Sequence, residues 1–183
     1  MKKILLKLSA SCLCLVGVVA CSSSPSSDSS LPSIKTSEQF RIENVALNVE
    51  QLVTPDIQYH TSAEIQSFVT DGIKENLSQA GLLTQDGTMD SLSIVITYHR
   101  RFVGDKTPIP SDSLAYPFFD YVIKIKSNDK QISTISKHNL TYRGGFTMNL
   151  KVAGGLLRDK SDEIAFIDAL SRSVSDTIES LKK

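Results

Sequence analysis

Apolar residues recur at every second position in several stretches of the chain, which is typical of a β-strand with one buried face. In the first stretch, Val45, Leu47 and Val49 would all point to the same side. Asn128-Asp129 suits a hairpin turn between two later stretches. A slip in the alternation between Ile132 and Ile135 predicts a β-bulge. The same pattern predicts four strands in all, at Arg41–Val53, Leu92–His99, Phe119–Lys126 and Ile132–Tyr142.

Two other stretches have apolar residues at three- and four-residue intervals and predict amphipathic helices. Thr61 and Glu64 have the spacing of a capping box, so the first helix should begin just after Thr61. Gly81 can end it in the left-handed conformation, and the last helix should begin at Asp159 or Ser161. The two apolar stripes are Ile65, Phe68, Val69, Ile73, Leu77 and Ala80, and Ile164, Ile167, Leu170, Val174, Ile178 and Leu181.

A shorter alternation, at Phe146, Met148, Leu150 and Val152, lies between two Gly-Gly pairs. This segment could extend the fourth strand, form a fifth strand, or lie along an edge as a flap. The element order is therefore β-α-β-β-β-(β)-α. Because each element has one apolar side, we expect an α+β fold in which an antiparallel sheet of four to five strands carries both helices on one face. The other face would be mixed in polarity and open to a partner.

The start of the chain has a different pattern. Two lysines precede an apolar run from Ile4 to Ala20, the layout of a secretory signal peptide. The run holds 17 residues and includes Lys7, which disfavours a membrane-spanning helix. It ends in Val18-Val19-Ala20-Cys21, which resembles the lipobox of bacterial lipoproteins. That resemblance implies removal of residues 1–20, a diacylglycerol group on Cys21 and acylation of its amino group.

Composition divides the remaining chain into a tether and a domain. Nine of the sixteen residues from Ser22 to Ser37 are serine, and such a segment cannot bury enough apolar surface to offset the cost of ordering. We expect a lipidated, disordered tether over residues 21–39 and a single periplasmic domain over residues 40–183. By the same resemblance, Ser22 in place of aspartate points to the periplasmic face of the outer membrane, with the inner membrane or cell surface as alternatives.

Charge and cysteine content limit the possible partners. Removal of the signal peptide leaves 20 − 3 = 17 basic residues against 20 acidic ones, a formal charge of −3. This balance gives no electrostatic reason to bind nucleic acid or anionic lipid. Cys12 and Cys14 leave with the signal peptide and Cys21 is lipidated, so the mature chain cannot form an internal disulfide. Its stability must come from a hydrophobic core.

Tyr98-His99-Arg100-Arg101 is the densest polar cluster of the chain. On a strand, Arg100 follows Tyr98 to one face and Arg101 follows His99 to the other. The two arginines should therefore not form a single clamp. Arg101 would either pair with an acidic neighbour or bind a carboxylate or phosphate, since its planar fork suits both. We take His99, Arg100 and Arg101 as candidate partner-binding residues.

Aromatic residues concentrate between Tyr116 and Tyr121, beside a proline-bearing loop. If Phe119 and Tyr121 face the core, Phe118 must face the other way. A surplus aromatic residue next to a loop is a candidate contact anchor. Phe118 and Tyr116 therefore join the candidate partner-binding residues.

Catalytic and metal-binding signatures are weak. None of His60, His99 and His138 has another histidine or cysteine at ligand spacing. The glycine pairs match no phosphate-binding loop, and no G-x-S-x-G elbow surrounds a serine. We expect no metal, no cofactor and no catalytic residues.

The lipobox, the serine-rich tether and the β-α-β-β-β-α layout together resemble small periplasmic lipoproteins that assist larger envelope machines. These include penicillin-binding-protein activators and auxiliary lipoproteins of lipid-transport complexes. The resemblance implies a non-catalytic binding or accessory subunit of a cell-envelope complex, with a protein partner. A small-ligand or lipid-binding lipoprotein and an envelope hydrolase are the alternatives. An enclosed apolar cavity would favour the first, and an Asp/His pair in a cleft the second.

Overall fold

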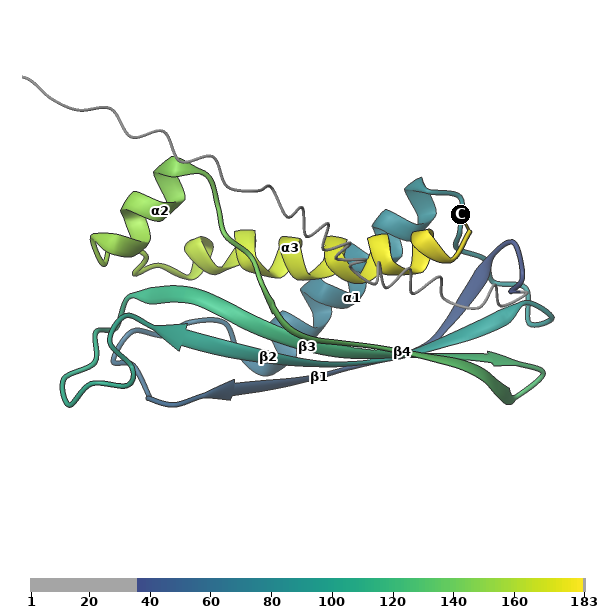
Figure 1. Ribbon diagram of the computed structural model, residues 1–183, viewed down its shortest axis with the longest axis horizontal. Helices are drawn as coiled ribbons and strands as arrows, with labels where there is room; N and C mark the ends of the chain where they lie inside the picture. The colour runs from purple at the N-terminus through teal and green to yellow at the C-terminus, as the bar shows by residue number, and fades with distance from the viewer. Residues whose placement is uncertain (1–35, 183) are drawn as a thin grey trace, which may run out of the picture. The chain divides into compact units, whose positions relative to one another are not determined.

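The computed structural model describes residues 36–182, so the predicted signal peptide, Cys21 and most of the tether lie outside the described residues. Figure 1 shows a layer of strands covered on one side by helices. The elements in chain order are β1 (Phe40–Gln51), α1 (Ser62–Gln79), β2 (Asp90–Phe102), β3 (Leu114–Ser127), β4 (Lys130–Thr141), α2 (Phe146–Ala153), α3 (Lys160–Glu179) and a short 3-10 turn, η1 (Ser180–Lys182). The α+β class is confirmed.

The four strands lie in the order β1-β2-β3-β4, and their pairing corrects the prediction of an antiparallel sheet. β3 is antiparallel to both β2 and β4, but β1 is parallel to β2, with Val45 opposite Ile94. Alternation of apolar residues shows which side of a strand is buried and carries no information on its direction. The direction follows from the connection, because α1 carries the chain back along the sheet before β2 begins. The sheet is therefore mixed.

Helices α1 and α3 cover one face of the sheet, which we call the inner face; the opposite side is the outer face. Most residues of the predicted apolar stripes meet the sheet there, and residues such as Ile73 of α1 and Val174 of α3 are fully buried, but Phe68 of the first stripe is 43% exposed. The capping box at Thr61 is confirmed. Gly81 takes a φ of +68°, and the N–H of Leu82 donates to the Leu77 carbonyl at 2.8 Å, which ends α1 as predicted.

The β3–β4 hairpin confirms both local predictions made for it. Asn128 and Asp129 form the turn with positive φ values of 48° and 62°. The pairing passes from Ser133 to Gln131 across one step of β3, so Ile132 is the extra residue of the predicted bulge. A second bulge, which the alternation did not indicate, lies opposite Asp120 and includes Asn139, whose φ is 54°.

Residues 146–153 form a helix, α2, which corrects the predicted strand, edge or flap. Apolar residues two apart are also four apart in pairs, so Phe146 with Leu150, and Met148 with Val152, fit two sides of a helix equally well. The glycine before the helix favours this outcome. A Cβ at Gly144 would overlap the side chain of Met148, so only glycine lets the helix approach this closely.

Candidate functional site

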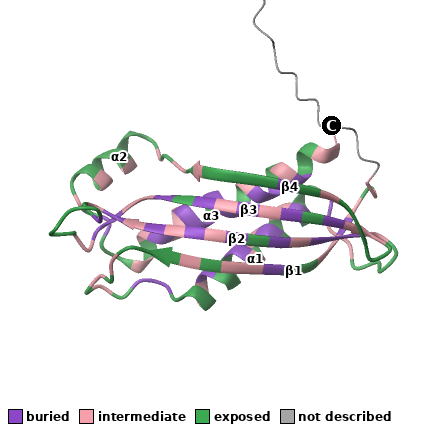
Figure 2. Cartoon of the chain, turned by 60° about the horizontal axis from the view of Figure 1, so that its bottom comes forward, coloured by how far each residue is buried: buried purple, intermediate pink, exposed green. Residues whose placement is uncertain are grey.

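The outer face of the sheet carries a recess of about 800 Å³ beyond the ends of β1 and β2. Four of the five predicted binding residues line it: His99, Arg101 and Phe118 from the outer face, and Arg100 from the other side of β2. His99 and Phe118 come from neighbouring strands, because His99 of β2 pairs with Phe118 of β3. Figure 2 shows this side of the sheet, with the strand residues alternating in burial. The other lining residues are Val49, Glu50, Gln51, Leu52, Lys106 and Asn139.

His99 lies between two carboxylates that belong to the strands on either side of it. Its Nδ1 is 3.1 Å from Oε2 of Glu50 on β1, and its Nε2 is 2.9 Å from Oδ2 of Asp120 on β3. Hydrogen bonding to His99, and then to the backbone N–H of Asn139, holds the pKa of Asp120 below its usual value. These contacts therefore link three neighbouring strands across the outer face.

The same geometry bears on the hydrolase alternative, since an Asp/His pair does lie at the edge of a recess. In a nucleophilic triad, one imidazole nitrogen faces a carboxylate and the other takes a proton from the nucleophile. Here both nitrogens of His99 face carboxylates. The pair thus lacks the free nitrogen that a general base requires, and its arrangement suits a structural cross-link.

Arg101 and Phe118 form the other wall of the recess. Arg101 pairs with Asp105 through two contacts, one of them at 2.7 Å from Nη2 to Oδ1. The hydrogen bond from Arg101 lowers the pKa of Asp105 and so keeps the pair charged. The guanidinium carbon lies 5.5 Å from the centre of the Phe118 ring, within the range of a cation–π contact. The aromatic ring is thereby held in place while 36% of the residue stays exposed.

Arg100 points to the inner face, as the alternation predicted, and does not join the other arginine. Its Nε and Nη2 atoms donate to the two carboxylate oxygens of Glu163 at 2.7 and 3.1 Å. Nη2 also donates to the carbonyl of His60 at 2.6 Å, and Nη1 to the side chain of Gln51 at 3.1 Å. Glu163 is fully buried. The pair therefore joins β2 to the first turn of α3 inside the protein.

Sequence reasoning missed Glu163, although a signal was present. Glu163 lies on the same side of the helix as Ile167 and Leu170, four and seven residues before them. A charged residue on an apolar stripe needs an opposite charge on the surface that it faces. Arg100 is likewise a charged residue on the buried side of a strand. The positions of Glu163 and Arg100, considered together, therefore indicate the contact between them.

Tyr116 lies apart from the recess, on the inner side of the sheet near α2. Its ring centre is 6.0 Å from that of Phe166 on α3. Its hydroxyl donates to Oδ1 of Asn149 on α2 at 2.5 Å. Tyr116 thus holds α2 to the rest of the fold, and no contact brings it to Phe118 or Arg101.

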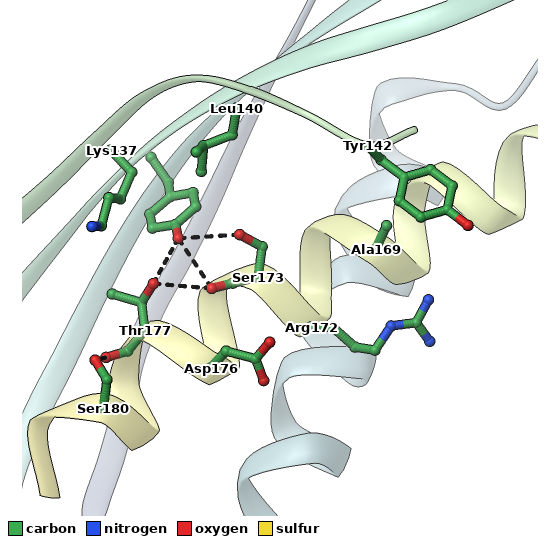
Figure 3. Close-up of a pocket in the computed structure, with 10 residues that line it drawn as sticks. Lys137, Leu140, Tyr142, Ala169, Arg172, Ser173, Asp176, Thr177 and Ser180 are labelled. Carbon is green, nitrogen blue, oxygen red and sulfur yellow. Dashed lines mark hydrogen bonds between the residues drawn. The ribbon is translucent and has the colours of Figure 1, made fainter. Parts of the chain in front are cut away.

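A second hollow, a groove of about 540 Å³, lies between β4 and α3 on the inner side. Figure 3 shows Lys137 and Leu140 on one wall, and Arg172 and Asp176 on the other. The hydroxyl of Tyr121 at its base is already bonded to the Ser173 carbonyl and to Thr177. The groove has charged walls and is open to one side. It is not the enclosed apolar cavity that would favour a small-ligand carrier.

Within residues 36–182, no group of three His, Cys, Asp or Glu side chains is placed to hold a metal ion. A search for membrane spans over the same residues finds no helix that is both long and apolar enough to cross a bilayer.

Comparisons with known proteins find similar solved structures and no match by sequence. No family model matches it, and no curated protein matches it. A minor lipoprotein from Acinetobacter baumannii aligns over 80% of this chain and 95% of its own, at 13% identity and a TM-score of 0.43. A protein from Xanthomonas campestris of the DUF330 family aligns over 80% and 85%, at 14% identity and a TM-score of 0.45.

Rare lipoprotein B from Shewanella oneidensis aligns over 76% of this chain and 99% of its own, at 13% identity and a TM-score of 0.26. Two of these three similar structures are thus named lipoproteins. At these identities and TM-scores, no residue, ligand or partner is carried over to this chain.

Proposed function

We propose that this protein is a lipid-anchored periplasmic subunit, held at the outer membrane through Cys21, that binds a protein of the cell envelope through the recess on its outer face. It works without catalysis or cofactor. The anchor rests on the lipobox and the preceding signal peptide. Three acyl chains, as the lipobox implies, would hold the chain to a bilayer almost permanently, because even two such signals give stable anchoring.

The observation that carries the binding role is a set of polar side chains held in place around exposed apolar ones. His99 contacts both Glu50 and Asp120, and Arg101 is paired with Asp105. Because these side chains are already held by contacts within the protein, a partner that covers them loses little side-chain entropy in ordering them.

The recess also offers exposed apolar side chains for contact. Phe118 is 36% exposed and Leu52 is 65% exposed. An aromatic side chain that is held in place, with polar groups around it that already have partners, is typical of an interface hot spot. The recess therefore suits a partner that inserts an apolar side chain, rather than a ligand recognised by its charge.

Site-specific photo-crosslinking in intact envelopes tests the proposal. A photoreactive amino acid in place of Phe118 or Leu52 should give one discrete adduct of higher mass. The same amino acid in place of Gln66, an exposed residue of α1 on the other side of the protein, should not give that adduct. Absence of an adduct at both recess positions, with the acylated protein present at its normal level, would contradict the proposal.

A further inference from the structure

Helix α2 and its flanking residues expose the densest group of large apolar side chains in the described part of the chain. Phe146 is 78% exposed, Leu150 is 55% exposed, and Leu156, just after the helix, is 65% exposed. Phe146 and Leu150 are four residues apart and share one side of the helix. We call these three residues the α2 patch.

The other side of α2 is what attaches it to the fold. Met148 and Val152 are half-buried against the core, and Asn149 accepts the hydrogen bond from Tyr116. The patch is therefore exposed while other side chains of α2 remain packed against the rest of the fold.

The charge of the whole chain is nearly balanced, but the segment that contains α2 is basic. The 29 residues from Lys130 to Arg158 contain no aspartate or glutamate, and five lysines or arginines. Arg143, Lys151 and Arg158 lie within or beside α2, whereas Lys130 and Lys137 belong to β4, which begins at the hairpin.

Acidic side chains from elsewhere neutralise this segment only in part. Lys151 comes within 3.9 Å of Asp162, near the limit for an ion pair, whereas Arg158 donates a hydrogen bond to Asp112 at 3.5 Å. Arg143, three residues before Phe146, and Lys137 form none of the ion pairs found among residues 36–182. Apolar side chains flanked by basic ones are typical of a segment that lies in a bilayer interface.

From these observations we infer that the α2 patch docks on the anionic phospholipid surface to which Cys21 anchors the chain, so that the helical side faces the membrane. This inference rests on the proposed anchor. Figure 1 shows α2 beyond the end of α3 and on the side away from the sheet. The recess on the outer face would then open away from the bilayer, toward a periplasmic partner.

The size of the patch favours a membrane over a protein partner. Its three side chains expose on the order of 350 Å², whereas a stable protein interface buries about 800 Å² on each side. Interfacial binding to a bilayer has no such minimum when an acyl anchor already supplies most of the affinity.

The tether is long enough to allow this contact. The chain enters the described domain at Thr36, next to Lys182 at the far end of α3 from α2. α3 has 20 residues and so spans about 30 Å. The 14 residues from Ser22 to Lys35 reach about 45–50 Å when extended, which covers that distance.

Depth-dependent quenching of a single fluorophore tests the inference with the acylated full chain. Because the sulfur of Cys21 is blocked by its lipid, Leu150→Cys would provide one site for an environment-sensitive dye. In vesicles of phosphatidylethanolamine and phosphatidylglycerol, we expect a blue-shifted emission and several-fold stronger quenching by spin-labelled lipid than for the control. The control is Val95→Cys, which is 44% exposed on the outer face of the sheet, between the fully buried Ile94 and Ile96.

Two variants connect the signal to the patch. Charge reversal with Arg143→Glu and Lys151→Glu, or replacement of Phe146 and Leu156 by serine, should each remove most of the quenching at position 150. These residues are exposed, so urea unfolding should show that the variants still fold.

Equal, weak quenching at positions 95 and 150, in vesicles that retain the protein, would overturn the membrane inference alone. Protein that fails to float with the vesicles would instead contradict the proposed anchor. A label at position 150 that is shielded in intact envelopes but not in protein-free vesicles would show that a protein covers the patch, which also contradicts the inference.

Discussion

Arg100 and Arg101 are adjacent in the sequence, and the alternation of the strand gives them unrelated roles. Arg101 forms part of an exposed recess, whereas Arg100 is held in a buried pair with Glu163. A buried pair adds little beyond what a well-packed apolar pair would add, but removal of one partner leaves an uncompensated charge. The cost of breaking the pair is thus far larger than its net contribution to stability.

Glu163→Ala should therefore lower the free energy of unfolding by about 3–5 kcal/mol. The matched control is Asp168→Ala on the exposed side of the same helix, which should change it by less than about 0.5 kcal/mol. Urea unfolding followed by circular dichroism measures both. A similar, small loss for the two variants would show that the Arg100–Glu163 pair is not held as described.

Phe118 and Phe119 offer a direct comparison of an outer-face and an inner-face position. Phe119 is 3% exposed in the core, and Phe119→Ala should cost about 3–5 kcal/mol of unfolding free energy. Phe118→Ala should cost less than about 1 kcal/mol and should abolish most of the crosslinking from position 52. Equal effects of the two substitutions on folding, with partner contact retained, would argue against Phe118 as an anchor.

At the scale of elements, Glu64 links α1 to α3. It closes the capping box at Thr61 and accepts a hydrogen bond from Lys160 at 2.9 Å. The Lys160 hydrogen bond, followed by those from Thr61, lowers the pKa of Glu64 to about 2. Because the folded pKa lies below the unfolded value, this stabilisation is complete above about pH 4.5 and is lost as the pH falls through about 2.

Glu64→Gln should therefore lose less stability than the unchanged protein when the pH falls from about 4.5 to about 2. Lys160→Met removes the partner and should reduce the same pH dependence. Thermal unfolding across this pH range gives the comparison. A wild-type profile in both variants would show that the α1–α3 link has no part in acid stability.

Two adjacent glycines before α2 have different environments. A Cβ at Gly144 would overlap Met148, whereas nothing lies within 4 Å of a Cβ at Gly145. Gly144→Ala should detach α2 and speed amide hydrogen exchange over residues 146–153. Gly145→Ala should leave exchange there nearly unchanged. Equal exchange rates in the two variants would contradict the close contact between Gly144 and the helix.

Most elements could be predicted because one local pattern determined each of them. Thr61 with Glu64, Gly81, and Asn128-Asp129 each act within a few residues, and all three took the predicted form. The errors arose where the deciding contact is distant. The parallel pairing of β1 depends on the path of α1, and the helix at residues 146–153 is held by Tyr116, which contacts Asn149 from 33 residues away.

The candidate site was predictable only in part, for the same reason. Alternation alone placed His99, Arg101 and Phe118 on the outer face and Arg100 on the other. It could not show that Glu50 and Asp120 would satisfy His99 from neighbouring strands, because that depends on register. Glu163 was missed since its partner lies 63 residues away in the chain.

At the scale of the whole molecule, the two sides of the protein suit different neighbours. The outer face bears a recess in which an exposed aromatic residue is surrounded by polar side chains that contact one another, which suits a protein partner. The helical side bears the α2 patch with Arg143 and Lys151 beside it, which suits a phospholipid surface. Both assignments depend on a chain that is fixed to a bilayer through Cys21, because only then do the two neighbours lie on opposite sides.

Intact mass measurement of the natively purified protein tests the lipid anchor. We expect a mature chain whose first residue is Cys21, with a diacylglyceryl thioether and an N-linked acyl chain, recovered in the membrane fraction. A chain that still begins at Met1, or an unmodified Cys21 in the soluble fraction, would contradict it.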